Sequence, residues 1–263
     1  MDRLDEIAAV TEDAERAAGK IMLSAQNIAD GVEEKDGVDN FVTAYDKKVQ
    51  RELKARFAKD VPEAAFVGEE EESRADVTRG LVFIVDPIDG TSNFLYGFCH
   101  SCVSVALLSE GRPVLGMVYN PYTDELFSAR AGRGAFRNGV PIHVSNGTIE
   151  RGLVLVGTAP YYREELADPS FRMIRSYFNQ CVDIRRSGSA ALDLCDVACG
   201  RAVLFCELRL SPWDYAAGAL IVEEAGGRVT TAESGPLVYD RKISILASGC
   251  RNAEKETSIP HDI

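Results

Sequence analysis

Carboxylates, a glycine and hydroxyl groups interrupt an apolar run at residues 84–94, which read IVDPIDGTSNF. Asp86 and Asp89 stand three positions apart, so a turn between them would let both carboxylates converge on a hard cation, which prefers oxygen ligands. Thr91 or Ser92 is a suitable N-cap for a short helix, and the free N–H groups at a helix start attract anions. These residue types predict a site that binds a metal ion and a phosphate group.

The stretch before these carboxylates is typical of a buried strand. Residues 81–85 are rich in β-branched side chains and uncharged, which favours a strand covered on both faces. We expect the strand to end at Asp86, because Pro87 removes a donor from the ladder and Gly90 permits a tight turn. A strand, an acidic turn and a helix start would then follow one another.

A run of glutamates follows a second strand-like segment. Residues 64–67 are apolar and lead to Gly68, after which the chain continues from Glu69 to Glu72 with glutamates alone. A glutamate run is usually a solvated loop, but a strand end can also deliver a carboxylate to a site. Strands that follow one another in sequence usually lie side by side, so this run could meet the turn at Asp86.

A third carboxylate stands near the start of a helix in the second half of the chain. Pro212 and Asp214 are ordinary helix-start residues, so capping and metal binding explain Asp214 equally well when it is taken alone. The small residues Ala216, Ala217 and Gly218 indicate close packing of this helix. A carboxylate on such a rigid element is suited to bind a metal ion.

Composition limits the class of protein. The 263 residues carry 29 basic and 41 acidic side chains, a net charge of -12, without a basic block. Binding to the phosphates of nucleic acid is therefore not expected. The N-terminus is charged rather than apolar, and no apolar run approaches the ~18 residues typical of a membrane span. We expect a cytoplasmic protein that has no membrane segment.

The cysteines do not form a disulfide framework. Their odd number and apolar surroundings favour reduced, mostly buried thiols. Cys99 and Cys102 resemble half of a zinc site, but no second pair lies at suitable spacing. We therefore expect neither a zinc site nor a catalytic cysteine. The seven cysteines are Cys99, Cys102, Cys181, Cys195, Cys199, Cys206 and Cys250.

Periodicity divides the chain into two parts. Apolar residues recur at helical spacing over residues 4–28, and a second helix is expected to begin near Thr43 or Asp46, after a loop at 31–40. Strands then form an antiparallel meander and a hairpin, and beyond the polar segment 145–151 strands alternate with helices. The expected strands are 102–108, 114–118, 125–129, 135–137, 140–144, 153–157, 182–185, 202–206, 228–230 and 244–247, and the later helices are 170–178, 189–198 and 214–225.

Three separated motifs together resemble the inositol monophosphatase family of magnesium-dependent, lithium-sensitive phosphatases. They are the segments 68–70, 86–94 and 213–227, and the likeness extends over nearly the whole chain. The resemblance implies an αβαβα layered sandwich of the α+β or α/β class, as in inositol monophosphatase and fructose-bisphosphatase. The site would lie in a cleft between an N-terminal α+β domain, 1–147, and a C-terminal α/β domain, 148–263.

The family pattern assigns metal ligands to this sequence. It makes Glu69, Asp86 and the main-chain carbonyl of Ile88 ligands of a first Mg²⁺ ion. It makes Asp86, Asp89 and Asp214 ligands of a second, so that Asp86 bridges the two. Oxygen ligands that are completed by a substrate phosphate suit this cation, and the cations would offset the repulsion between the carboxylates and an anionic substrate.

Two details of this assignment stay open. Asn40 stands near the position where some family members have an aspartate, so a third, weaker Mg²⁺ site that shares Glu69 is an alternative to a two-ion site. If the loop is shifted by one residue, Glu70 replaces Glu69 as the ligand.

The resemblance also assigns the chemistry of hydrolysis. Thr91 and Asp46 would orient and deprotonate a metal-activated water, with Glu69 completing the catalytic group. Backbone N–H groups of Gly90 and Thr91 would hold phosphate oxygens. The residues matched to further substrate contacts, mainly with the alcohol, are Asp89, Gly188, Ser189, Ala190, Glu207 and Asp214.

The function implied by the resemblance is Mg²⁺-dependent hydrolysis of a small phosphorylated polyol, with inositol monophosphate as the leading candidate. Fructose 1,6-bisphosphate, histidinol phosphate and phosphoadenosine phosphate are alternative substrates, although Glu207 and the pair Trp213-Asp214 favour the inositol phosphatases. A regulatory binding protein with secondary phosphatase activity is an alternative of another class. The resemblance also suggests a homodimer.

Overall fold

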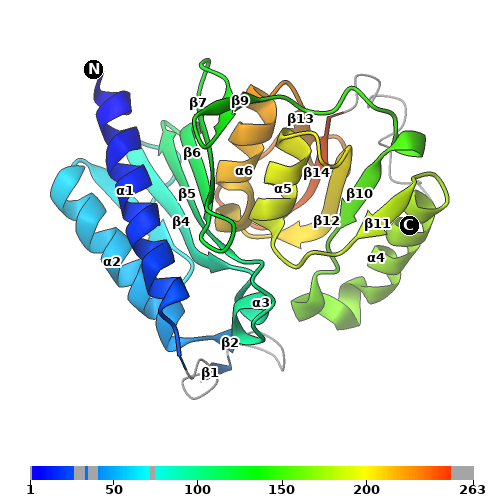
Figure 1. Cartoon of the computed structure of the whole chain (residues 1–263), viewed down its shortest axis with the longest axis horizontal. Coiled ribbons are helices and arrows are strands. Elements are labelled where there is room, and N and C mark those ends of the chain that lie inside the picture. The colour runs from blue at the N-terminus through cyan, green and yellow to red at the C-terminus, as the bar shows by residue number, and fades with distance from the viewer. Residues whose placement is uncertain (1, 27–32, 35–40, 72–74, 250–263) are drawn as a thin grey trace.

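The computed structural model describes residues 2–26, 33–34, 41–71 and 75–249. Its elements form five layers in the order helix, sheet, helix, sheet and helix (Figure 1). This order confirms the expected αβαβα sandwich. In these residues no helix combines the length and the apolar composition that crossing a membrane would require.

The first layer contains two helices, α1 (Arg3–Leu23) and α2 (Ala44–Asp60). Each begins with a capping box, at Asp2 and at Thr43, in which the cap residue and the third helical residue satisfy each other's N–H groups. Helix α1 ends at Leu23, where polar residues follow its apolar face, so the helix is shorter than expected. The predicted end, Ile28, lies outside the described residues.

The second layer is a seven-stranded sheet in the order β3-β4-β5-β6-β7-β8-β9. Strand β3 runs parallel to β4, and all later neighbours are antiparallel, so the expected meander and hairpin are confirmed. The strands are β3 (Ala64–Gly68), β4 (Leu81–Asp89), β5 (Cys102–Ser109), β6 (Arg112–Asn120), β7 (Glu125–Arg130), β8 (Ala135–Arg137) and β9 (Val140–Ile142).

Strand β4 is longer than expected. It does not end at Asp86 but continues to Asp89, and its pairing with β5 is irregular between these two residues. Pro87 lies within the irregular part, where its missing N–H group interrupts no regular ladder. The short helix α3 (Thr91–Leu95) follows, and its N-cap is Gly90 instead of the expected hydroxyl residue.

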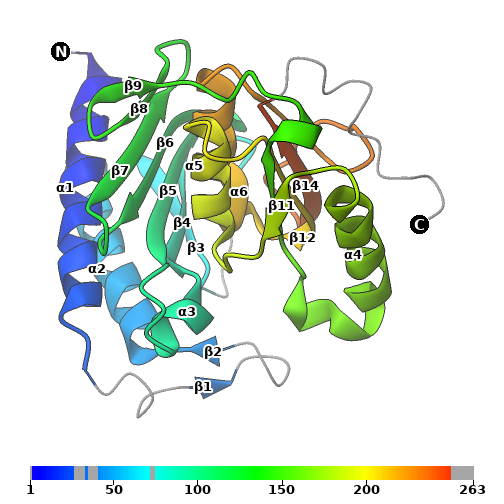
Figure 2. The same ribbon diagram turned by 45° about the vertical axis from the view of Figure 1, so that its right-hand side comes forward.

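The third layer, α5 (Ala190–Ala198) and α6 (Pro212–Glu224), lies between the two sheets (Figure 2). Most residues of α6 are buried because this helix contacts both sheets. Gly116 of β6 permits a close approach, since a Cβ atom there would lie 2.6 Å from the carbonyl oxygen of Ala217. The close packing expected from the small residues of α6 is confirmed.

The fourth layer is a five-stranded mixed sheet in the order β11-β10-β12-β14-β13, and helix α4 (Arg163–Phe178) covers its outer face as the fifth layer. Strand β10 is parallel to both neighbours and β14 is antiparallel to both. Helix α4 begins well before the expected start at Ser170 because it accommodates Pro169 in its interior. The strands are β10 (Leu153–Val156), β11 (Asp183–Arg185), β12 (Leu204–Leu210), β13 (Arg228–Thr230) and β14 (Ile243–Ser248).

Short elements complete the described chain. They are β1 (Glu33–Glu34), β2 (Phe41–Val42) and the 3₁₀ turns η2 (Ile149–Arg151) and η3 (Pro160–Tyr162). The pairing of β1 with β2 places a strand inside the segment 31–40, which we had interpreted as a loop.

The two sheets share a hydrophobic core. The segment 145–151 connects the last strand of the first sheet to the first strand of the second. One cluster of buried side chains nevertheless contains Ile84 of the first sheet, Leu220 of α6 and Phe205 of the second sheet. The middle helices therefore join the two halves rather than merely separating them.

Candidate metal centre

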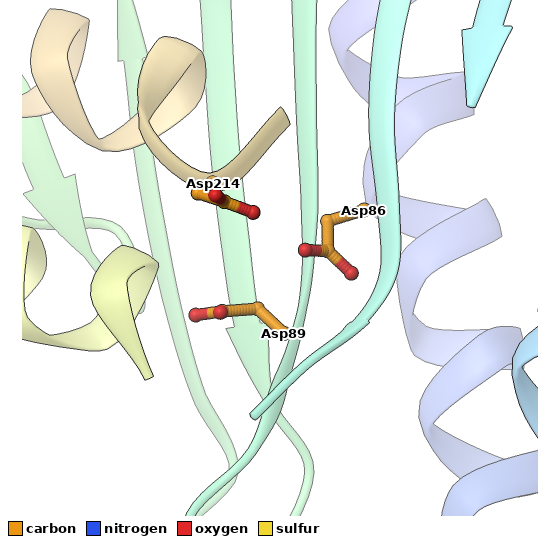
Figure 3. A group of neighbouring side chains, drawn as sticks. All are labelled: Asp86, Asp89 and Asp214. Atoms are coloured by element: carbon orange, nitrogen blue, oxygen red, sulfur yellow. The ribbon is translucent and has the colours of Figure 1, made fainter. Parts of the chain in front are cut away.

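A β-bulge turns Asp86 and Asp89 to the same side of the first sheet. Asp86 lies opposite Ser104 and Asp89 lies opposite Cys102 on strand β5. An advance of three residues along β4 therefore pairs with an advance of two residues along β5. Side chains of a regular strand alternate between faces, and one extra residue resets that alternation. Both carboxylates consequently lie on the face that is turned toward α6 (Figure 3).

Asp214 completes a group of three carboxylates. It lies in the first turn of α6, and its Oδ2 atom accepts a hydrogen bond from the N–H group of Ser211 (2.7 Å). Ligand oxygen atoms of Asp86, Asp89 and Asp214 lie within 4.8 Å of one another, and Figure 3 shows the three side chains converging. This spacing would let the three side chains bind one cation.

Burial and mutual repulsion act on all three carboxylates. Burial, and after it the neighbouring carboxylates, raises the pKa of Asp86 well above its usual range. Burial raises the pKa of Asp89 to about 6, although hydrogen bonds from Ser189 and Ala191 oppose the rise. Burial and Asp89 also raise the pKa of Asp214. A divalent cation would remove this repulsion, and a set of carboxylate oxygens fits Mg²⁺.

Glu69 reaches the same pocket from the neighbouring strand. Strand β3 is paired in parallel with β4, and the N–H group of Glu69 donates to the carbonyl of Val85 (3.1 Å). Glu69 and Ile88 line the pocket together with the three aspartates, whereas Glu70 is not among the lining residues. Asn40, the candidate for a third ion, lies outside the described residues.

Thr91 and Asp46 meet beside this group. The Thr91 hydroxyl lies 3.3 Å from Asp46 Oδ1 and 3.1 Å from the carbonyl oxygen of Ile88. The other oxygen of Asp46 accepts from the N–H group of Thr43 (2.8 Å), which completes the capping box of α2. The Asp46 side chain can therefore stabilise the start of α2 and accept a hydrogen bond from Thr91 at the same time.

Residues of the second half form the other wall of the pocket. Gly188, Ser189 and Ala190 line it there, and Gly90 of the first half lines it as well. The backbones at Gly90 and Gly188 have φ values of +85° and +92°, a region that favours glycine. Asn93 ties the two walls together, because its Nδ2 atom donates to the carbonyl of His100 (2.7 Å) and to that of Ser187 (2.9 Å).

Glu207 lines the same pocket from strand β12. It is 9% exposed, and its Oε1 atom accepts a hydrogen bond from the N–H group of Ala159 (2.9 Å). Gly157 makes room for the carboxylate, since a Cβ atom there would lie 2.0 Å from Glu207. Burial raises the pKa of Glu207 to about 7, although the hydrogen bond from Ala159 opposes the rise.

Sequence reasoning missed several residues of the pocket lining, among them the polar side chains of Tyr161, Arg186 and Asp193. Asp193 is buried in α5, and its Oδ1 atom has no hydrogen-bond partner. Its spacing of one helical turn after Ser189 was an available signal. No local pattern marked Tyr161 or Arg186, which reach the pocket through the packing of the second sheet.

The described cysteines are free thiols, but only three of the six are fully buried, and Cys181 and Cys199 are half-buried. Cys102, Cys195 and Cys206 are buried free thiols, whereas Cys99 is exposed. Cys250 lies outside the described residues.

Comparisons with known proteins agree with this geometry. The model of the inositol monophosphatase family matches residues 3–261. The chain is 40% identical to inositol monophosphatase 2 of Solanum lycopersicum, covering 86% of this chain and 87% of the relative, and 36% identical to Nus factor SuhB of Escherichia coli strain K12, covering 84% of each. The crystal structure of extragenic suppressor protein suhB from Bartonella henselae matches with a TM-score of 0.88 and 35% identity over 96% of both chains. The chain therefore belongs to the inositol monophosphatase family and is a phosphatase.

Proposed function

We propose that the chain is a Mg²⁺-dependent phosphomonoesterase that hydrolyses a small phosphorylated polyol, with inositol monophosphate as the first candidate. The observation that carries the proposal is the convergence of Asp86, Asp89 and Asp214 in a pocket that also contains Glu207. The name of the Solanum lycopersicum relative, inositol monophosphatase 2, supports the choice of substrate.

Two Mg²⁺ ions would be held by oxygen atoms of this chain, and a third remains an alternative. Glu69, Asp86 and the carbonyl of Ile88 would hold one ion, and Asp86, Asp89 and Asp214 the other. When bound, the ions would lower the pKa of a coordinated water and offset negative charge on the phosphoryl group.

Thr91 and Asp46 would prepare the nucleophilic water. With a separation of 3.3 Å, the Thr91 hydroxyl can donate to Asp46 while it accepts a hydrogen bond from the water, which orients the water and draws off its proton. Glu69 would assist from the end of the neighbouring strand β3. Backbone N–H groups of Gly90 and Thr91 would hold the phosphate oxygens.

The alcohol of the substrate would occupy the side of the pocket formed by the second half. Glu207 uses Oε1 to accept from Ala159, which leaves Oε2 for a substrate hydroxyl. Gly188, Ser189 and Ala190 would contribute further contacts, together with Asp89 and Asp214 at the metal side.

A binding role is the second candidate function, because one relative carries the name Nus factor SuhB. In that case the chain would act as a regulatory binding protein with secondary phosphatase activity. Substitution of Asp89 by Asn would separate the roles, since it should abolish hydrolysis and leave binding to a protein partner intact.

We further propose that the enzyme is a lithium-sensitive, cytoplasmic homodimer. Tyr96 and Phe98, which follow α3, are 69% and 75% exposed, and a second copy of the chain would cover such aromatic side chains. Sizing chromatography should give about twice the 28.7 kDa of one chain. Lithium added at fixed Mg²⁺ should inhibit phosphate release.

A substrate panel tests the main proposal. Phosphate release is measured with inositol monophosphate, fructose 1,6-bisphosphate, histidinol phosphate and phosphoadenosine phosphate, each with Mg²⁺ or with a chelator. We expect the highest kcat/KM for inositol monophosphate, and only with Mg²⁺. A higher kcat/KM for another substrate would replace the substrate assignment, and no release from any phosphomonoester would refute the proposal.

A further inference from the structure

Arg186 lines the pocket but has no role in the function proposed above. It is the only basic side chain among the described residues of the lining, and the same lining contains six carboxyl groups. The residue is exposed, and within the described part of the chain its guanidinium makes no hydrogen bond or ion pair. A guanidinium carries five N–H donors, so these donors are available to a ligand in the pocket.

The chain holds Arg186 at the place where the two walls of the pocket meet. Arg186 stands between β11 and α5, and the carbonyl of the next residue, Ser187, accepts a hydrogen bond from Asn93 of α3 (2.9 Å). Gly188 leaves room for the guanidinium, since a Cβ atom there would lie 2.5 Å from Arg186 Nη1 and 3.0 Å from Asn93 Nδ2. The end of the Arg186 side chain therefore lies beside Asn93, next to the segment that lines the second wall.

Arg186 and Glu207 are opposite charges that share the pocket without forming an ion pair. Burial raises the pKa of Glu207, and the hydrogen bond from Ala159 and the charge of Arg186 oppose the rise. The guanidinium is thus near enough to act on the carboxylate but does not bind it. A donor and an acceptor arranged in this way suit a ligand with several hydroxyl groups, because each hydroxyl can both accept and donate.

The charge on this side of the pocket favours a neutral group over a second anion. A second phosphate on the alcohol would be attracted by Arg186 but repelled by Glu207, whereas a hydroxyl is not repelled by either. Like charges brought together are a common means of rejecting the wrong ligand. The pair Arg186 and Glu207 therefore fits an uncharged polyol.

We infer that Arg186 donates hydrogen bonds to hydroxyl oxygens of the substrate's alcohol and thereby makes the enzyme select uncharged polyols. The inference rests on the proposed function, because it places the alcohol beside the second half of the chain. Arg186 adds a donor to the acceptor that Glu207 provides. A site built to hydrogen-bond a substrate hydroxyl discriminates against an analogue that lacks it.

The test compares Arg186→Met with Arg185→Met as a matched control. Arg185 does not line the pocket, and its guanidinium pairs with Asp183 and donates to the carbonyl of Ile184 (2.7 Å). Kinetics are measured with inositol monophosphate and with 4-nitrophenyl phosphate, whose alcohol has no further hydroxyl group. We expect Arg186→Met to raise KM for inositol monophosphate about tenfold, with little change in kcat, and to leave 4-nitrophenyl phosphate hydrolysis unchanged. Arg185→Met should change neither reaction.

Three results would overturn the inference. KM for inositol monophosphate could stay unchanged in Arg186→Met. The loss could be equal with 4-nitrophenyl phosphate, which would show that Arg186 acts on the phosphoryl group or on the fold. The loss could be greater with fructose 1,6-bisphosphate than with inositol monophosphate, which would show that Arg186 binds a second phosphate.

Calorimetric binding of inositol monophosphate in the presence of Mg²⁺ separates the inference from the proposed function. A wild-type protein that binds this compound about tenfold more tightly than Arg186→Met does, but hydrolyses none of the substrates, would refute the proposed function alone. Equal binding by the two proteins, with hydrolysis by wild type, would refute the inference alone.

Discussion

Asp46 and Asp214 each have two roles in the fold. Asp46 completes the capping box of α2 and also approaches the Thr91 hydroxyl, and Asp214 accepts from Ser211 at the start of α6 while it faces Asp86 and Asp89. Because a cap restricts the rotamer of the capping side chain, each carboxylate is in position before a cation or a substrate binds.

Replacement of Thr91 by Val should remove the orientation of the nucleophilic water. We expect kcat to fall about 10²- to 10⁴-fold, the range typical of a positioned acid or base, while KM changes little because the backbone N–H groups remain. Thr91→Ser is the control, since it keeps the hydroxyl and should retain most of the activity. Steady-state kinetics at saturating Mg²⁺ decide between the outcomes, and an equal loss in both variants would contradict the role of the hydroxyl.

The sequence indicated residues that stand in local motifs and missed those placed by tertiary packing. Asp86, Asp89 and Asp214 are recognisable because each carboxylate follows an apolar run or stands near a helix start, where a polar side chain needs an explanation. Tyr161 and Arg186 follow no such rule. They line the pocket because the second sheet brings their segments there, and that placement has no local signal.

At the scale of elements, the irregular part of β4 is the feature that sequence reasoning interpreted wrongly. The sequence predicts that the strand ends at Asp86 before Pro87, but in the structure Pro87 lies within a bulge and the strand continues to Asp89. The bulge is what brings both carboxylates to one face. A turn and a bulge would each bring Asp86 and Asp89 close together. Only the observed bulge explains why both side chains lie on the same face of the sheet.

Helix α1 contains a buried carboxyl group that should make stability depend on pH. Glu15 is fully buried, and neither of its oxygens has a hydrogen-bond partner. Burial, with the charge of Glu12, raises its pKa well above the usual range in the folded protein. Below the unfolded pKa both states hold the proton. As the pH rises toward the folded pKa only the unfolded state loses it, so stability falls.

Glu15→Gln should therefore be more stable than wild type at neutral pH. Between the unfolded and the folded pKa of Glu15, the difference in unfolding free energy between variant and wild type should grow by about 1.4 kcal/mol per pH unit. Denaturant unfolding at a series of pH values measures it, with Asp13→Asn on the exposed face of α1 as the control. A difference that does not change with pH would show that Glu15 is not neutral in the folded protein.

At the scale of the whole molecule, we propose that residues 1–147 and 148–263 are two structural units with one shared core. Helix α6 belongs to the second unit by sequence but packs against β6 of the first, where Gly116 meets Ala217. A cluster of buried side chains also crosses the boundary. Neither unit can bury its apolar face without the other.

This arrangement predicts cooperative unfolding. Calorimetry of the full chain without Mg²⁺ should give a single transition whose calorimetric and van't Hoff enthalpies agree. Each unit expressed alone should remain unfolded by circular dichroism, because it exposes the part of the core that the other covers. Two separate transitions, or a folded isolated unit, would contradict the shared core.

The central claim is that the three converging aspartates hold the Mg²⁺ on which hydrolysis depends. The most direct measurement is phosphate release from inositol monophosphate over a Mg²⁺ titration, for wild type, Asp89→Asn and Asp168→Asn, the last being an exposed control on α4. We predict release only with Mg²⁺, a loss of at least about 100-fold in Asp89→Asn, and no change in Asp168→Asn. Release that persists in a chelator, or an Asp89→Asn variant as active as wild type, would contradict the account.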